Sequence, residues 1–349
     1  MERIRGCPQD GATDRLRTPT YSGPVVRFRR SLSLVAAGAC AAAGLLLTLL
    51  GAWPHLQFAH RVLAMAGAFV PYGALLWALA GVFTLVGAAG RWRLLALPCA
   101  LGLALHLAWA AAYLPGTPPQ PTASTLRVAA LNTLYGKSDV TVAAQRLREA
   151  DADVIVLLEV SDPFVETPAL AGLLDQYPYR LGRTASGKVG YDDASATLVV
   201  SRRPMTERAQ LDSAFDQFVL RTSTVDGRDV TVLAVHPMNM VPGTALWRRE
   251  AETVAAAVRD HRTDPLVVIG DLNATRENAT YPIMAAGLTD AARQSGAGWQ
   301  PTFGGSTALP PLIAIDHALV NDQVVAHGFS TFAVPGSDHR GIVVDVSLR

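Results

Sequence analysis

The sequence predicts an α/β domain of layered sheets, preceded by three membrane-spanning helices. Half of the 349 residues are apolar, and the mean hydropathy of +0.24 is high for a soluble protein. The longest apolar stretches all lie before residue 115. After residue 125, short β-branched runs alternate with segments of helical period, which is typical of α/β domains.

Three apolar stretches are each long enough to cross a bilayer, which takes about 20 residues. They run from Ser31 to Trp53, from Val62 to Ala89 and from Trp92 to Leu114, and arginine occurs only at their ends. A cleaved signal peptide is the alternative for the first stretch, but its apolar region would span only about 7–15 residues. Since two further stretches follow, we expect three transmembrane helices within residues 31–114.

The basic residues predict the orientation of these helices. Residues 1–30 contain seven arginines and three acidic residues, and basic segments favour the cytoplasmic side. We therefore expect a cytoplasmic head (1–30) and, after an odd number of spans, everything beyond Leu114 outside a bacterial cell membrane. The Pro-rich residues 115–125 are predicted to form a linker. All three cysteines precede this linker, so the outer domain has no disulfide.

Residues 126–349 are predicted to form one domain, with extended runs bounded by turn residues. The expected strands are 126–132, 153–159, 195–201, 217–225, 229–236, 266–271, 315–320 and 341–348, and the expected helices are 138–150 and 243–261. Ser138 and Thr244 are the predicted N-caps, and Asp226-Gly227 predicts a hairpin. Because many strands are almost entirely aliphatic, we expect sheets packed in layers with helices outside.

Polar side chains follow or begin several of these strands. They are Asn132, Glu159, His236, Asp271 with Asn273, Asp316, and Asp338 with His339. Taken singly, an Asp or Asn after a strand is usually turn chemistry. A carboxylate that ends an aliphatic run is harder to explain, because burial requires a partner or a metal. Together these groups suit a hard cation such as Mg²⁺ and the cleavage of a phosphoester.

In this order the motifs resemble those of the endonuclease/exonuclease/phosphatase superfamily, whose fold is similar to that of DNase I. The matching segments are "LNTLYG", "LLEVSD", "VHPMN", "GDLNAT", "IDHALV" and "GSDHRGIVV", spread over residues 126–349. The resemblance implies a four-layer α/β/β/α sandwich and a metal-dependent phosphoric ester hydrolase. The implied cofactor is Mg²⁺, with Mn²⁺ as the alternative ion.

The resemblance also implies roles for individual residues. The implied metal ligands are Glu159 and Asn132, with Asp271 and Asp338 as further candidates; the implied catalytic residues are His236, Asp271, Asn273, Asp316, Asp338 and His339. Asp338 would orient His339, and Asp316 would orient a histidine or complete the metal shell. The sequence departs from the family pattern at His317, where an aromatic residue is common. His317 is therefore either an extra phosphate contact or a packed ring. Arg221 is a weaker candidate for a phosphate clamp, and residues 191–195 for a loop at the rim.

Charge favours a substrate held by the membrane. Residues 115–349 carry 20 lysine and arginine residues against 26 aspartate and glutamate residues, a net charge of −6. Affinity for nucleic acid depends largely on basic residues, so nucleic acid is disfavoured as a partner. The tether to a bilayer favours lipid-linked phosphates, such as polyprenyl pyrophosphates or phospholipid headgroups.

The chain also resembles membrane proteins found with glycopeptide-resistance genes in actinomycetes. An outward-facing nuclease and a non-catalytic sensor or scaffold remain as alternatives.

Overall fold

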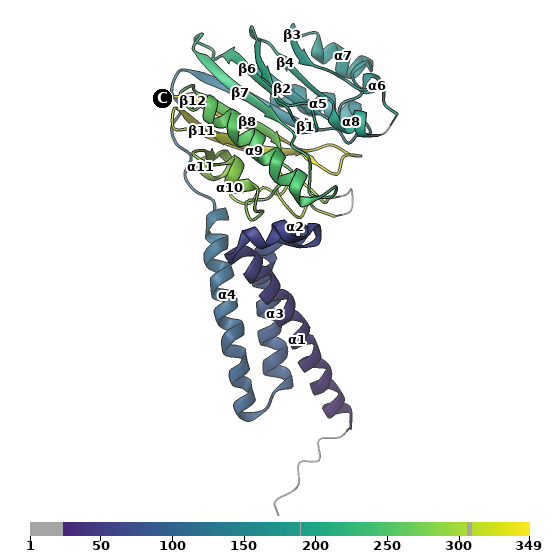
Figure 1. Cartoon of the computed structure of the whole chain (residues 1–349), viewed down its shortest axis with the longest axis vertical. Helices are drawn as coiled ribbons and strands as arrows, with labels where there is room; N and C mark the ends of the chain where they lie inside the picture. Colours follow the sequence, from purple (N-terminus) through teal and green to yellow (C-terminus); the bar gives the residue numbers. More distant parts are fainter. Residues whose placement is uncertain (1–23, 189, 306–308) are drawn as a thin grey trace, which may run out of the picture.

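The structure is a computed structural model that describes residues 24–188, 190–305 and 309–349. An α/β domain stands on one end of a helical bundle (Figure 1). Most of the predicted head lies outside the described residues, and its described part belongs to the first helix of the bundle.

The α/β domain contains two six-stranded sheets. The first has the order β11-β12-β1-β2-β4-β3 and the second has the order β5-β6-β7-β8-β10-β9. The strands are β1 (Thr125–Asn132), β2 (Val154–Leu158), β3 (Tyr179–Gly182), β4 (Thr197–Ser201), β5 (Thr206–Gln210), β6 (Phe218–Ser223), β7 (Asp229–Val235), β8 (Leu266–Asp271), β9 (Thr289–Asp290), β10 (Asp316–Val320), β11 (Val324–Ala333) and β12 (Arg340–Leu348). Every strand that the sequence predicts is present within a few residues, and β3, β5, β9 and β11 are additional.

Each sheet contains one parallel pair joined by a long helix. Helix α5 (Val140–Ala150) joins β1 to its parallel neighbour β2, and α9 (Thr244–Asp260) joins β7 to β8. The shorter helices of this domain are α6 (Asp162–Val165), α7 (Pro168–Leu174), α8 (Tyr191–Ser195), α10 (Tyr281–Met284) and α11 (Ala291–Gln294). Because parallel strands end at the same edge, each pair delivers two strand ends to one side of the domain.

Both predicted N-caps are wrong by one residue. The side chain of Asp139, not Ser138, accepts from the backbone amides of Thr141 and Val142, both at 3.0 Å. Helix α9 has Gly243 at its N-cap, and the hydroxyl of Thr244 instead donates to Phe58 O at 2.7 Å. A contact with the membrane-side segment therefore replaces the local cap at Thr244.

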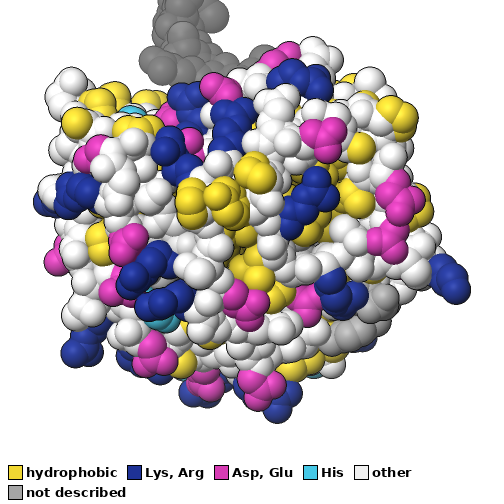
Figure 2. Space-filling view, turned by 90° about the horizontal axis from the view of Figure 1, so that it is seen from above, with side chains coloured by type: hydrophobic (Ala, Val, Ile, Leu, Met, Phe, Trp, Pro, Cys, Tyr) yellow, Lys and Arg dark blue, Asp and Glu magenta, His cyan; other side chains and the backbone are white. Residues whose placement is uncertain are grey.

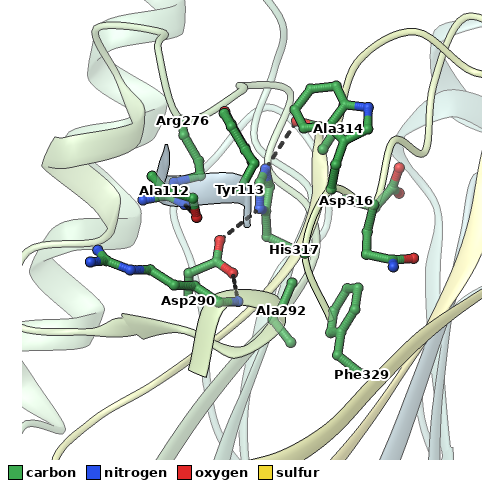
Figure 3. A pocket seen from close by; sticks show the side chains of 14 residues that line it. Ala112, Tyr113, Arg276, Asp290, Ala292, Ala314, Asp316, His317 and Phe329 are labelled. Atoms are coloured by element: carbon green, nitrogen blue, oxygen red, sulfur yellow. Dashed lines mark hydrogen bonds and ion pairs between the residues drawn. The ribbon is translucent and has the colours of Figure 1, made fainter. Parts of the chain in front are cut away.

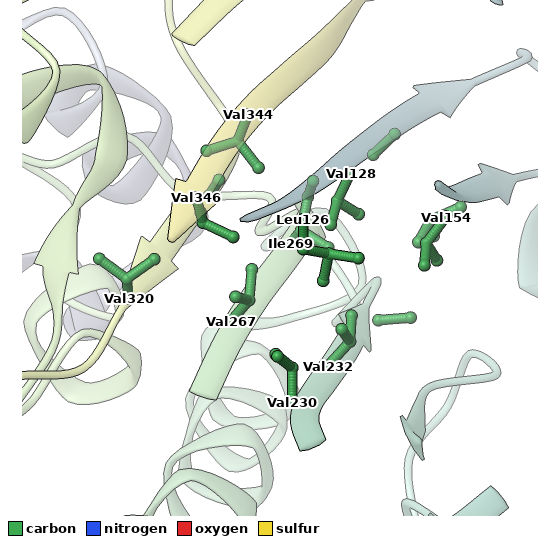
Figure 4. Close-up of a cluster of buried hydrophobic side chains, with 14 of the residues drawn as sticks. Leu126, Val128, Val154, Val230, Val232, Val267, Ile269, Val320, Val344 and Val346 are labelled. Carbon is green, nitrogen blue, oxygen red and sulfur yellow. The ribbon is translucent and has the colours of Figure 1, made fainter. Parts of the chain in front are cut away.

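The main core lies between the two sheets. Aliphatic side chains from both sheets interdigitate there, including Val128, Val154, Val232, Ile269 and Val344 (Figure 4). A second cluster packs α5 and α7 on the outer face of the first sheet, and a third packs α9 and α10 on that of the second. The four layers of an α/β/β/α sandwich are thus present, and they account for strands that are apolar on both faces.

The bundle consists of α1 (Pro24–Ala52), α3 (Gly73–Gly87) and α4 (Ala96–Ala110). Short 3₁₀ segments flank these helices: η1 (Pro54–Ala59), η2 (Val70–Tyr72), η3 (Gly90–Leu95) and η4 (Ala111–Tyr113). Three segments are long and apolar enough to cross a membrane, namely Arg27–Ala52, Val70–Gly87 and Gly90–Tyr113. The first and third agree with the predicted stretches.

The second predicted stretch is wrong at its start. Its first residues form a separate helix, α2 (Arg61–Gly67), which lies across the end of the domain that faces the bundle (Figure 1). Gly67 packs directly against the side chain of Gln57, and Pro71, which has no backbone N–H, follows within one turn. The apolar composition is continuous here, but the helix is not.

Helix α2 and η1 are fixed to the α/β domain by buried polar contacts. Gln57, which is fully buried, donates to Glu277 O at 2.8 Å and accepts from Asn278 Nδ2 at 3.0 Å and from Ala279 N at 3.1 Å. Asn278 Nδ2 also donates to Ala64 O of α2 at 2.8 Å. The domain therefore has a defined orientation on the bundle, in addition to the covalent connection through residues 115–124.

Candidate active site

Six strand ends meet at one edge of the sandwich and bring the predicted polar residues together. Asn132, Glu159, His236 and Asp271 stand at or just after the carboxyl ends of the two parallel pairs. Strand β10 is antiparallel to β8 and begins with Asp316, which is the register partner of Asp271. Strand β12 is antiparallel to β1 and follows His339. Strand starts and strand ends thus reach the same edge because of these antiparallel pairings.

The centre of the site is a buried carboxylate pair bridged by an amide. Asn132 Nδ2 donates to Glu159 Oε1 at 3.0 Å and to Asp271 Oδ2 at 3.3 Å. The oxygen of Asn132 accepts from Leu134 N at 3.0 Å. Asn132 therefore gives both carboxylates a donor in this conformation. His236 Nε2 faces the same two oxygens that accept from Asn132, at 3.8 Å from Glu159 Oε1 and 3.7 Å from Asp271 Oδ2.

His339 is held by Asp316 and not by Asp338. Its Nδ1 lies 2.9 Å from Asp316 Oδ2, and both side chains are buried. Its Nε2 points into the site, 3.7 Å from Asp271 Oδ2 and 3.9 Å from Asp338 Oδ1. The geometry thus gives the orienting contact to Asp316, which is one of the two roles expected for it. Asp338 is instead 39% exposed and lies beside the Nε2 atom of the ring.

Asn273 is positioned by its backbone. Its amide N donates to Asp271 Oδ1 at 2.8 Å, and its side-chain Nδ2 donates to Pro237 O at 2.9 Å. Trp247 Nε1 donates to Asn273 O at 3.3 Å. These contacts connect the "GDLN" turn to the segment after His236 and leave the oxygen of the Asn273 side chain for the site.

Two site residues adopt a left-handed backbone conformation. Glu159 has a φ of 52° and Asn273 a φ of 46°. Non-glycine residues with positive φ are uncommon, and such conformations gather at functional sites. In the same turn, Gly270 has a φ of 144°, and a Cβ there would lie 2.0 Å from Val235 O. Only glycine allows β8 to lie this close to β7 immediately before Asp271.

Burial dominates the electrostatics of the site. It raises the pKa of Glu159 and that of Asp271 above their ordinary values, because both charged forms lose water. Burial lowers the pKa of His236 to about 3, so this ring is neutral at physiological pH. For His339, burial alone would lower the pKa, but the carboxylates of Asp316 and Asp271 outweigh it and raise the pKa to about 10.

Of the weaker candidates, His317 and Arg221 lie away from this centre, whereas the segment 191–195 adjoins it, because Ala194 packs in one buried cluster with Phe215, whose ring contacts His236. The ring of His317 is a packed ring: its Nε2 is 3.1 Å from the carbonyls of both Ala274 and Ala314, and its Nδ1 faces Asp290 at 3.4 Å (Figure 3). Arg221 pairs with Asp229 at 3.1 Å on the β6–β7 hairpin. In the segment 191–195, Asp193 accepts from Gly187 N at 2.7 Å, and the side chains of residues 191 and 192 lie outside the described residues.

Two aromatic rings of the site were not predicted. Phe215 packs on His236 with 4.7 Å between ring centroids, and Phe303 packs on His339 with 4.8 Å. Gln217 fixes the backbone of His236 by accepting from its amide N at 3.1 Å. Phe215 and Phe303 lie outside the predicted strand ends, so the sequence carried no signal for them, whereas Gln217 begins the predicted strand 217–225 and the strand-end pattern could have found it.

The residues present fit a hard divalent cation. Glu159 Oε2 is buried and has no hydrogen-bond partner among the described residues, and the Glu159 side chain is only 12% exposed. Ligand atoms of Asp271, Asp316 and His339 lie within 4.8 Å of one another. An unpaired buried carboxylate oxygen beside a second carboxylate is costly unless a cation neutralises it. Carboxylate oxygens are the preferred ligands of Mg²⁺, so Glu159 and Asp271 are the best-placed ligands.

A two-sheet sandwich with this set of carboxylates, amides and histidines at one edge belongs to a class of phosphoester hydrolases. The chain is a member of the endonuclease/exonuclease/phosphatase family, whose model matches residues 130–339. The family consists of hydrolases that act on phosphate esters, typically with a divalent metal.

Solved structures with the same fold come from several organisms. A family protein from Bacteroides thetaiotaomicron is 17% identical, with a TM-score of 0.50 over 66% of this chain and 100% of that one. A functionally unknown conserved protein from Enterococcus faecalis is 14% identical, with a TM-score of 0.50 over 64% and 100%. TDP2 from C. elegans is 15% identical, with a TM-score of 0.50 over 82% and 94%. At these identities the likeness shows the fold alone. The search of curated proteins gave no match.

Proposed function

We propose that this protein is a membrane-anchored, divalent-metal-dependent phosphoesterase that acts on lipid-linked phosphates or pyrophosphates, with its site outside the cell membrane. The observation that carries the proposal is the unpaired Oε2 of Glu159, buried in a site that also contains Asp271, His236 and His339. The resemblance to resistance-associated membrane proteins agrees with a lipid carrier as substrate.

The side chains have complementary roles in such a reaction. A divalent cation bound by Glu159 and Asp271 would stabilise negative charge on the phosphoryl oxygens. The carboxylates of Asp316 and Asp271 keep His339 protonated, so its Nε2 would donate a hydrogen bond to the phosphoryl group, with the ring fixed through Nδ1 by Asp316. His236, kept neutral by burial, would donate a hydrogen bond to the phosphoryl or leaving-group oxygen. Asn273 would orient the phosphate from the turn that follows β8.

Surface charge supports a lipid over nucleic acid. On the face turned away from the bundle, Lys and Arg side chains are interspersed with Asp and Glu side chains, around a group of apolar ones (Figure 2). Among the described residues drawn there, no single-sign basic area covers this face. Neutralising a nucleic-acid backbone requires clustered basic residues, whereas a phosphate attached to a lipid needs only the site and the membrane.

A substrate panel tests the proposal. Purified full-length protein in detergent is offered polyprenyl pyrophosphate, phospholipids, inositol phosphates and DNA, with Mg²⁺ or EDTA. We expect phosphate release from a lipid substrate, with a fall of about 10²–10⁴-fold in the Glu159→Gln variant. Glu166 is exposed and follows Glu159 a few residues later in the chain, so Glu166→Gln provides the matched control. Turnover of DNA alone would favour the nuclease, and a cellular phenotype that survives Glu159→Gln would favour the sensor.

A further inference from the structure

An apolar pocket separates α2 from the loops of the site. It has a volume of about 290 Å³ and is lined by Met65, Ala68, Phe69, Asn239, Met240, Val241, Asn273, Asn278, Phe303, Ile313 and Ile315. The polar side chains among these are asparagines, and the others are hydrocarbon or thioether groups. Pockets of this size and composition bind apolar ligands.

The floor of the pocket is apolar and buried, and its mouth is exposed. Ala68, Ile313 and Ile315 are buried and pack with Phe303 in one cluster. At the mouth, Met65 is 49% and Phe69 38% exposed. Both residues lie on or just after α2, at the end of the domain that faces the bundle (Figure 1). The opening is therefore next to the bilayer surface if the bundle crosses a membrane.

The inner end of the pocket belongs to the site. Asn273 lines the pocket and is also bonded through its amide N to Asp271. Phe303 lines it too, and its other contact is the ring of His339, 4.8 Å away between centroids. A molecule in the pocket therefore touches two residues that adjoin the reacting groups. The inner end of the pocket therefore adjoins the phosphoryl site through Asn273 and Phe303.

We propose that this pocket holds the first part of the hydrocarbon chain of the membrane lipid whose phosphoester is bound at Asp271 and His339. The inference rests on the proposed function for the phosphoryl half of the substrate. It adds a subsite that selects amphiphilic phosphoesters over water-soluble ones. Each methylene transferred from water into the pocket would raise affinity by about fourfold.

The first test measures chain-length dependence with full-length protein in detergent and n-alkyl phosphates of increasing length. We expect kcat/KM to rise by about fourfold per methylene until the pocket is filled. The Ala68→Trp variant fills the pocket and should abolish this rise. Val62 is exposed on the same helix and outside the pocket, so Val62→Trp should retain the rise. An equal rise in both variants would overturn the inference.

Two additions keep the test decisive. If Ala68→Trp does not fold, Phe69→Ser removes an exposed wall of the pocket and should reduce the rise. An alkyl phosphate with a diazirine at the end of its chain reports binding without turnover, and we expect it to label α2 or residues 309–315. Labelling there without hydrolysis of any phosphoester would sink the proposed function and leave the pocket assignment intact. Hydrolysis with labelling elsewhere would refute the pocket alone.

Discussion

One buried side chain makes three of the hydrogen bonds that hold the α/β domain on the bundle. Gln57 is fully buried, donates to Glu277 O at 2.8 Å and accepts from Ala279 N at 3.1 Å. The variant Gln57→Met keeps the length of the side chain and removes every one of its hydrogen bonds. In the α/β domain it leaves the carbonyl of Glu277 and the amide of Ala279 without this partner, while Asn278 retains its bond to Ala64 O; the longer bond that is lost, to Leu50 O at 3.4 Å, lies within the N-terminal helical part.

The expected effect follows from these two orphaned groups. A buried polar group that loses its partner costs about 1–3 kcal/mol, so the docked state should lose about 2–4 kcal/mol relative to the undocked one. This change corresponds to a rise of about 30- to 700-fold in the opening equilibrium. Hydrogen exchange of the full chain in detergent measures it at the amide of Ala279, which should exchange faster by this factor.

The control is another residue of the same 3₁₀ segment. His55 is exposed, so His55→Met should leave the exchange of Ala279 unchanged. If Gln57→Met also left this exchange unchanged, the contact would not hold the domain to the bundle, and the reasoning would be refuted.

Three further predictions concern the site and the sheet that carries it. Asp316→Asn should lower kcat by about 10²-fold or more with little change in KM, because it frees the ring of His339; steady-state kinetics that showed only a KM effect would argue against this role. Gly270→Ala should lower the free energy of unfolding by about 2–4 kcal/mol, since its Cβ would lie 2.0 Å from a carbonyl of the neighbouring strand. The control Gly172→Ala, in a helix with open space around the new Cβ, should instead be neutral or stabilise by about 0.5–1 kcal/mol in the same melting experiment. Mg²⁺ should raise the melting temperature of the wild type by neutralising buried carboxylates, and this rise should vanish in Glu159→Gln; an equal rise in both proteins would count against a cation at Glu159.

Local patterns carried much of the information on the site. The polar residues at the ends of aliphatic runs were ambiguous singly and became recognisable through their joint occurrence in one order, because strands that are buried on both faces leave only their ends for chemistry. Glu159 and Asp271 illustrate this, since Glu159 follows the buried strand β2 and Asp271 ends the buried strand β8. The aromatic supports Phe215 and Phe303 had no such pattern and became evident only through their contacts.

The sequence by itself determined three apolar segments, eight of the strands and the residue types at their ends, because hydropathy and strand period act over a few neighbouring residues. Only the tertiary structure decided which carboxylate holds His339. Asp338 is its neighbour in the chain, but Asp316 reaches Nδ1 at 2.9 Å because β10 pairs with β8 and begins at the same edge. The tertiary structure also separated α2 from the second apolar segment and placed it against the domain. Continuous hydropathy cannot distinguish a membrane span from an apolar helix packed on a domain surface, and the hydrogen bonds of Gln57 and Asn278 made the difference here.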